Sequence, residues 1–264
     1  MLRIVFASII LVVSFHSSAT EAEKPLVGPR PIAVLLTKDP WGMVLGADTP
    51  WFALYDDGQV IFVEQTSENE YTHMAARLTP SELAGVKAKL STYVAEPAPK
   101  EINLRPGVSD QPESQFFLDV DGHKLAVFVY GLGTPADSDD EPTDGRDGVD
   151  VLPASIKGLH QYLSEFHVAT AKKWTPDQIE VMLWDYSYAP DASIQWPAHW
   201  PDLSDSTTLK RGDAYSIFLP GTQEEALIAF LATRREKGGV ELDGKKWAVS
   251  YRRVFPRWHD AFSK

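Results

Sequence analysis

The sequence predicts an α+β protein with a mostly antiparallel sheet built from repeated hairpin-helix units. The pattern F-x-L-x-x-D-G occurs twice, beginning at Phe52 and at Phe116, and apolar runs flank both copies. Asp-Gly favours tight hairpin turns, because glycine accepts a positive φ and aspartate tolerates one. A third pair, Asp243-Gly244, precedes the strand-like run 247–255. About three helix-like segments lie between these strands, so we expect hairpins braced by helices.

Residues 1–19 have the composition of a signal peptide. Arg3 supplies a positive start, residues 4–15 form an apolar run, and small residues at 17–19 suit cleavage. The run is short for a membrane span, so we expect export, with cleavage after residue 19 or as late as residue 22. The alternatives are an uncleaved anchor and a buried N-terminal helix. No later stretch approaches the ~18 continuous apolar residues of a span. The sequence therefore predicts a soluble periplasmic or secreted protein without stable membrane insertion after cleavage.

The chain contains no cysteine and carries a formal net charge of −12 at pH 7. The first property excludes disulfides, thiolate metal sites and cysteine nucleophiles, so stability has to come from the hydrophobic core. A core is expected, because 44% of the residues are apolar. The second property disfavours nucleic acid as a partner, because an acidic surface repels phosphate. Composition does not indicate an oligomeric state.

The order of these segments predicts the domain organisation. Residues 20–50 are rich in proline and are expected to run extended, with 32–36 apolar enough to add one edge strand. Residues 51–170 are expected to form a hairpin-helix-hairpin-helix half. Residues 171–264 are expected to form a second half, packed on the first, with a strand, a Trp/Pro loop and a strand-helix-strand ending.

Capping signals predict where the helices begin. Thr79 and Glu82 are spaced as a capping box around a proline at the first helical position. Pro153 begins the second helix, whose apolar residues recur at helical spacing. Thr222 and Glu225 are placed as a capping box for the third, which ends in basic residues and a Gly-Gly pair, as helix C-termini favour.

Residues 176–188 could form a helix or a strand. The Thr-Pro pair at 175–176 is typical of a helix start. Ile179, Val181 and Leu183, however, alternate with residues of the other face, several of them aromatic. A period of two with β-branched and aromatic residues favours a strand that is apolar on both faces, and we expect the strand.

Several of these motifs together resemble a group of exported bacterial proteins of unknown function. They are the hairpin FALYDDGQV at 52–60, the Leu-Thr-Pro helix start at 78–80, the two Trp-Pro pairs near residue 200, and the ending YRRVFP at 251–256. The resemblance spans most of the mature chain. It rests on turn and packing residues, so it implies no activity.

Aromatic residues around the ambiguous strand form the first candidate site. On a strand, Trp184, Tyr186 and Tyr188 would share one face, and Trp196 and Trp200 follow in the Trp/Pro loop. Planar rings with polar edges suit sugar rings and proline-rich peptides. We therefore expect a glycan or peptide ligand at these five residues. The alternative is that the same rings pack into the core.

The acidic loop between residues 131 and 150 is the second candidate. It concentrates carboxylates, the oxygen ligands that calcium prefers, beside two flexible glycines. The EF-hand spacing is absent, and a solvated acidic loop is the alternative. The candidate calcium ligands are Asp137, Asp139, Asp140, Asp144 and Asp147.

Catalytic motifs are missing from the sequence. It contains no G-x-S-x-G, S-x-x-K or H-E-x-x-H pattern. Triads can be dispersed along a chain, and 37 acidic residues always furnish carboxylate pairs. We therefore expect a non-catalytic binding module, with no catalytic residue and no cofactor other than calcium. A hydrolase that uses carboxylates on envelope polysaccharide or peptide is the alternative function.

Overall fold

The computed structural model describes residues 28–38, 40, 49–67, 70–95, 97–132 and 151–262. These residues form three α-helices and two mostly antiparallel sheets, which confirms the predicted α+β class. The first sheet contains β1 (Pro31–Lys38), β2 (Phe52–Tyr55), β3 (Gln59–Ser67), β4 (Glu70–Arg77), β5 (Glu101–Asn103), β6 (Glu113–Val120), β7 (His123–Tyr130) and β8 (Lys172–Lys173). The second contains β9 (Gln178–Asp185), β10 (Ile194–Gln195), β11 (Leu209–Arg211), β12 (Ala214–Pro220), β13 (Val240–Leu242) and β14 (Lys245–Arg253). The helices are α1 (Pro80–Ser91), α2 (Ala154–Ser164) and α3 (Glu224–Ala232), with short 3-10 helices η2 (Gly221–Gln223) and η3 (Trp258–Ala261).

Strand β1 lies in the middle of the first sheet, whose order is β5-β7-β6-β1-β2-β3-β4-β8. The expectation of an edge strand at 32–36 was therefore wrong. Both repeats of F-x-L pair with β1, so that Leu35 stands opposite Phe52 on one side and Phe116 on the other. Two apolar hairpins each need a neighbour that is buried on both faces, and β1, buried from Pro31 to Leu36, supplies it to both.

All three Asp-Gly pairs form hairpin turns, as predicted. Asp121-Gly122 and Asp243-Gly244 are two-residue loops in which both residues have positive φ, between 52° and 82°. The turn at Gly58 is one residue longer. There only the glycine has a positive φ, of 84°, and its N–H donates to the carbonyl of Tyr55.

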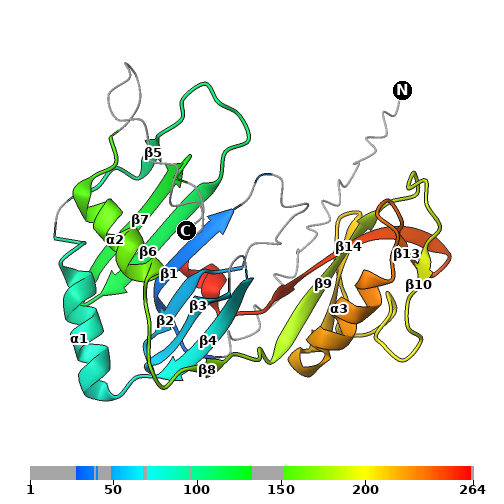
Figure 1. Ribbon diagram of the computed structural model, residues 1–264, viewed down its shortest axis with the longest axis horizontal. Helices are drawn as coiled ribbons and strands as arrows, with labels where there is room; N and C mark the ends of the chain where they lie inside the picture. The colour runs from blue at the N-terminus through cyan, green and yellow to red at the C-terminus, as the bar shows by residue number, and fades with distance from the viewer. Residues whose placement is uncertain are drawn as a thin grey trace, which may run out of the picture.

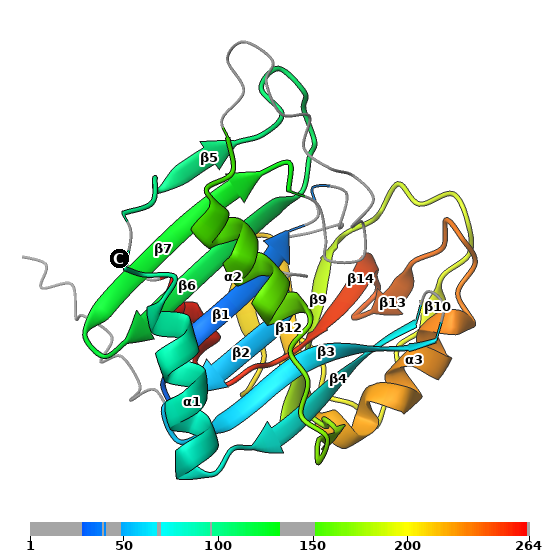
Figure 2. The same cartoon turned by 60° about the vertical axis from the view of Figure 1, so that its left-hand side comes forward.

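Helices α1 and α2 lie side by side on one face of the first sheet (Figure 2). Helix α1 begins with the predicted capping box, in which the N–H of Glu82 donates to Thr79 Oγ1 and the N–H of Thr79 donates to the Glu82 carboxylate. Helix α2 begins after Pro153 without a side-chain cap. It buries Ile156 and its neighbours on the stripe against the sheet, so the main core lies between the two helices and the strands.

The second sheet is built around β9, in the order β10-β13-β14-β9-β12-β11. Strand β9 pairs antiparallel with β12 and β14, which confirms the strand over the helix at 178–185. Helix α3 covers one face of this sheet (Figure 1). The predicted capping box at Thr222 is absent, because that residue lies inside η2 and α3 begins at Glu224. The side chain of Glu225 is instead 3.6 Å from Lys173, which it faces across the junction of the two sheets.

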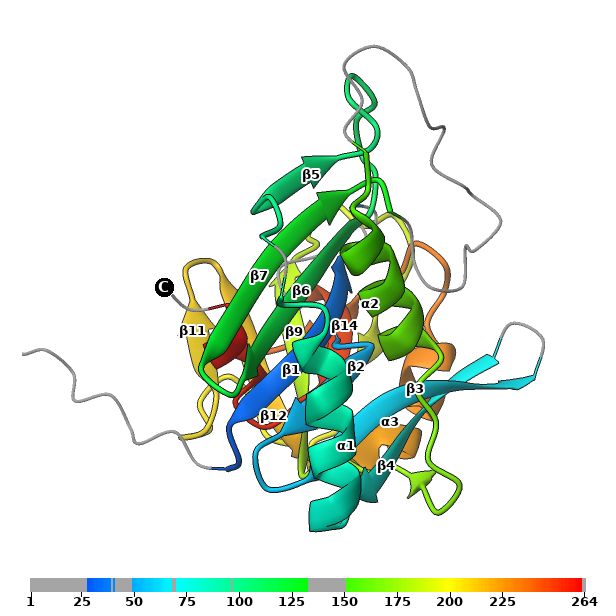
Figure 3. The same ribbon diagram turned by 90° about the vertical axis from the view of Figure 1, so that its left-hand side faces the viewer.

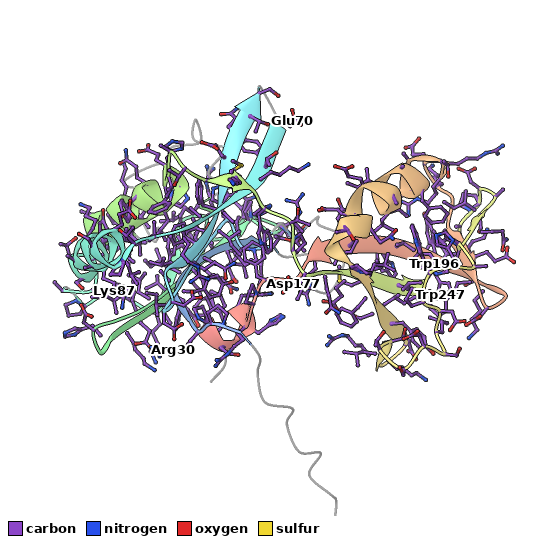
Figure 4. The ribbon with its side chains drawn as sticks, turned by 90° about the horizontal axis from the view of Figure 1, so that it is seen from below. Arg30, Glu70, Lys87, Asp177, Trp196 and Trp247 are labelled. Carbon is purple, nitrogen blue, oxygen red and sulfur yellow. The ribbon has the colours of Figure 1, made fainter. Side chains whose placement is uncertain are left out.

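After β14 the chain returns to the first sheet. Phe255 and Trp258 pack on the sheet face opposite α1 and α2, against Val34, Tyr55 and Trp174. Figure 3 shows η3, in red, behind the sheet that carries the two helices in front. The side-chain view in Figure 4 shows two lobes with Asp177 at the narrow connection between them. The C-terminal segment thus anchors the second sheet to the outer face of the first.

Candidate binding site

The two tryptophans of the Trp/Pro loop are core residues. Trp196 and Trp200 are 7% and 8% exposed, and their ring centroids lie 5.1 Å apart and within 5.9 Å of Phe230 on α3. Figure 4 shows Trp196 inside the second lobe, near Trp247. For these two residues the core-packing alternative describes the structure, because both rings are buried and pack against Phe230 of α3.

The other three aromatic residues do not share one strand face. Strand β9 ends at Asp185, and Tyr186 and Tyr188 lie in the turn that follows, closed by a hydrogen bond from the N–H of Ala189 to the carbonyl of Tyr186. Their rings are 5.0 Å apart and at 88° to each other, with Tyr188 74% exposed. Trp184 is half-buried in β9. The five residues therefore form no single flat platform, and ligand binding at Tyr186 and Tyr188 stays a prediction.

The candidate calcium ligands Asp137, Asp139, Asp140, Asp144 and Asp147 lie outside the described residues. Within the described ranges, no group of three or more His, Asp or Glu side chains is arranged to hold a metal ion. The calcium prediction thus rests on composition alone.

A buried ionic cluster connects strands β9, β12 and β14 of the second sheet. Glu180 of β9 accepts hydrogen bonds from Arg252 Nε, at 2.7 Å, and from Ser216 Oγ, at 2.6 Å. Arg211 donates to the same serine, and the Arg252 guanidinium lies 5.8 Å from the ring of Trp258. Sequence reasoning missed this cluster, although a lone carboxylate within a strand that is apolar on both faces signals a buried partner. Glu180 and Arg252 are both buried and bound to each other, which indicates a structural role.

A cavity of about 370 Å³ lies between η3 and the outer face of the first sheet. That volume is within the usual range for small-molecule sites, about 300–1,000 Å³. Four segments contribute its walls: the entry to β1, strands β6 and β7, and η3. The lining residues are Arg30, Pro31, Phe117, Asp119, Lys124, Leu125, Ala126, Asp260 and Ala261.

The charged groups of this cavity are paired in two sets. Asp119 is only 10% exposed and is bound by Arg30 Nη1, at 2.9 Å, and by Lys124 Nζ, at 3.5 Å. The Asp121-Gly122 turn creates the second contact, because it places Asp119 directly opposite Lys124 on the paired strand. Across the cavity, Asp260 Oδ2 accepts a hydrogen bond from Arg257 Nε, at 2.9 Å, and lies 2.8 Å from Arg257 Nη2 in an ion pair.

Sequence reasoning did not find this cavity. Its lining comes from residues 30–31, 117–126 and 260–261, which are far apart in the chain. The available signal was the hairpin register, which pairs Asp119 with Lys124. The contribution of the C-terminal segment has no local signal, because it depends on the chain returning to the first sheet after β14.

The comparisons with known proteins add no relative. No protein-family model matches this chain, and neither the curated proteins nor the solved structures contain a match. Among the described residues, no helix has the length and apolar character needed to cross a bilayer.

Proposed function

We propose that this chain is an exported, non-catalytic binding protein that takes part of a peptide or glycan into the cavity beside η3. The observation that carries the proposal is the make-up of that cavity. Pro31 and Phe117 give it an apolar part, and charged groups converge on it from both sides. A concave site that combines an apolar part with convergent polar groups is a usual geometry of a binding site. The half-buried Tyr186 and the exposed Tyr188 offer a further aromatic surface for a longer ligand.

Carboxylate hydrolysis is less well supported by the same geometry. A general acid has to carry a proton and a general base has to reach a water molecule. In the cavity, Asp119 is held by two cations and Asp260 by the two nitrogens of one guanidinium. This pairing leaves both carboxylates engaged in ion pairs. It therefore suits recognition better than proton transfer.

Binding is tested by titrating the purified exported protein with a panel of short peptides and oligosaccharides, followed by amide chemical shifts in NMR spectra. We expect shifts at Lys124 and Asp260, and unchanged ligand masses after prolonged incubation. The variant Ala126→Trp fills the cavity without changing a charge and should abolish these shifts. Ala88→Trp, on the exposed side of α1, is the matched control. Cleavage of any panel member that Ala126→Trp prevents would replace the binding function with hydrolysis.

Export is tested separately, in a bacterial host with a periplasm. The full chain should appear in the periplasm or medium without residues 1–19, or without residues up to 22. A chain that begins at residue 20 should stay in the cytoplasm. An uncleaved full chain in the membrane fraction would contradict the proposal.

A further inference from the structure

The ion pairs of the cavity beside η3 constrain the charge of its ligand. On one wall, Arg30 and Lys124 both bind the carboxylate of Asp119, and Arg30 also faces Asp56, whose Oδ2 lies 3.9 Å from Arg30 Nε. Arg30 is half-exposed, and Lys124 is 73% exposed. A guanidinium has five N–H donors and an ammonium three, so both keep donors beyond those used on Asp119. This wall can accept a carboxylate.

The opposite wall has the complementary property. Asp260 uses Oδ2 for the hydrogen bond from Arg257 Nε and for the ion pair with Arg257 Nη2, and its Oδ1 accepts no hydrogen bond from the residues that the structure describes. A carboxylate oxygen has lone pairs for two acceptor bonds. The η3 wall can therefore accept a donor, and an ammonium group gains most there because charge-assisted bonds are the strongest.

Ligands of a single charge fit this arrangement poorly. A simple anion would gain at Arg30 and Lys124, but it would meet Asp260 and approach a chain with a net charge of −12. A simple cation would gain at Asp260, but it would leave the remaining donors of Arg30 and Lys124 unused. A ligand with both charges satisfies the two walls, and its apolar part can lie on Phe117.

From this geometry we infer that the cavity binds a small zwitterion, namely a free amino acid or a short peptide with both termini unblocked and an apolar side chain. The carboxylate lies against Arg30 and Lys124, the ammonium against Asp260 Oδ1, and the side chain against Phe117. This inference rests on the proposed binding function and narrows its ligand class.

Calorimetric titrations with matched probes test the inference. L-leucine and the dipeptide Leu-Leu carry both charges, N-acetyl-L-leucine lacks the ammonium, and L-leucinamide lacks the carboxylate. We expect leucine or Leu-Leu to bind, and the blocked analogues to bind at least about tenfold more weakly, since each loses a charge-assisted contact. Equal affinity for N-acetyl-L-leucine, or stronger binding of the disaccharide cellobiose, would overturn the zwitterion and leave the binding function standing.

Two variants assign the charges to the two walls. Asp260→Asn should weaken leucine about tenfold and leave N-acetyl-L-leucine unchanged, whereas Lys124→Gln should weaken leucine and leave leucinamide unchanged. Lys124 is exposed, so its variant keeps the test open if Asp260→Asn unfolds. Lys237→Gln, on the exposed surface of the second lobe, is the control that should change nothing. If leucine and Leu-Leu fail to bind at millimolar concentration, the inference is wrong, and the binding function then depends on another panel member whose binding Ala126→Trp abolishes.

Discussion

Arg253 of β14 donates a hydrogen bond over 2.7 Å to Nδ1 of His73 in β4, and so joins the two sheets. An arginine can only donate, so Nδ1 of the histidine has to be an acceptor. Nε2 therefore carries the proton and donates to the carbonyl of Pro50, at 3.1 Å. Arg253 also binds Glu224 at the start of α3. The contact thus requires a neutral imidazole at the junction between the lobes.

This requirement predicts a loss of stability in acid. Burial, and secondarily Arg253, lowers the pKa of His73 to about 4, against an opposing effect of the Pro50 carbonyl, and burial alone lowers the pKa of His160 to about 4. Between pH 6.5 and 4 the unfolded state binds more protons than the folded state, so stability falls as the pH falls through this range. A pKa decrease from 6.5 to about 4 lowers the free energy of unfolding in acid by at most about 3 kcal/mol for each histidine. Urea unfolding at pH 7 and at pH 4.5 measures the difference.

The contribution of His73 is isolated by substitution. His73→Gln should lower stability at pH 7 and reduce the loss between pH 7 and 4.5, because one of the two shifted groups is removed. His123→Gln, at an exposed position, should leave both values unchanged. An equal loss in wild type and His73→Gln would show that the histidine is not held neutral at the junction.

The cluster around Glu180 predicts an asymmetric response to mutation. Glu180→Gln leaves the 8% exposed Arg252 without its carboxylate and should cost about 3–5 kcal/mol in the free energy of unfolding. The double variant Glu180→Leu, Arg252→Met removes both charges and should cost much less, because neither is left buried alone. Denaturant unfolding of the three proteins decides the point. If the double variant were as unstable as Glu180→Gln, the ion pair would stabilise the sheet by its own attraction. The loss in Glu180→Gln would then not come only from leaving Arg252 without a partner.

Replacing glycine with alanine should lower the free energy of unfolding by different amounts in two of the hairpin turns. Gly58→Ala places a Cβ 2.9 Å from the carbonyl oxygen of Leu78, in addition to the strain of a φ of 84°. Gly244→Ala meets nothing within 4 Å and carries only the strain of a φ of 70°. We expect about 1 kcal/mol for Gly244→Ala, and at least about 2 kcal/mol for Gly58→Ala, from thermal unfolding. Equal costs would mean that the backbone at Gly58 shifts to accommodate the methyl group.

The aromatic residues of the candidate site should differ in their contribution to stability, because some lie in the core and others on the surface. Trp200→Ala removes a buried ring beneath α3 and should cost about 3–5 kcal/mol. Tyr188→Ala removes an exposed ring and should cost less than about 1 kcal/mol. Thermal unfolding checks both values. A large loss for Tyr188→Ala would place that ring in a folded contact rather than on a free surface.

Local signals predicted most of the fold. The three Asp-Gly turns, the Thr79 capping box and the strand at 178–185 were confirmed, because each depends on residues within a few positions of one another. The capping box at Thr222 failed because the chain tightens into η2 before α3 begins. A capping motif specifies a helix start only where the surrounding backbone lets the chain enter the helix at that residue.

The sequence by itself determined the hairpins, the helix stripes and the acidic, cysteine-free character of this protein, because these follow from local backbone preference and composition. Only the tertiary structure decided that β1 is central, that Trp196 and Trp200 are core, and that the segment after β14 closes a cavity on the first sheet. These outcomes depend on which distant apolar surfaces bury one another. Phe116 and Phe52, 64 positions apart, meet Leu35 from opposite sides because both strands bury more area there than at an edge.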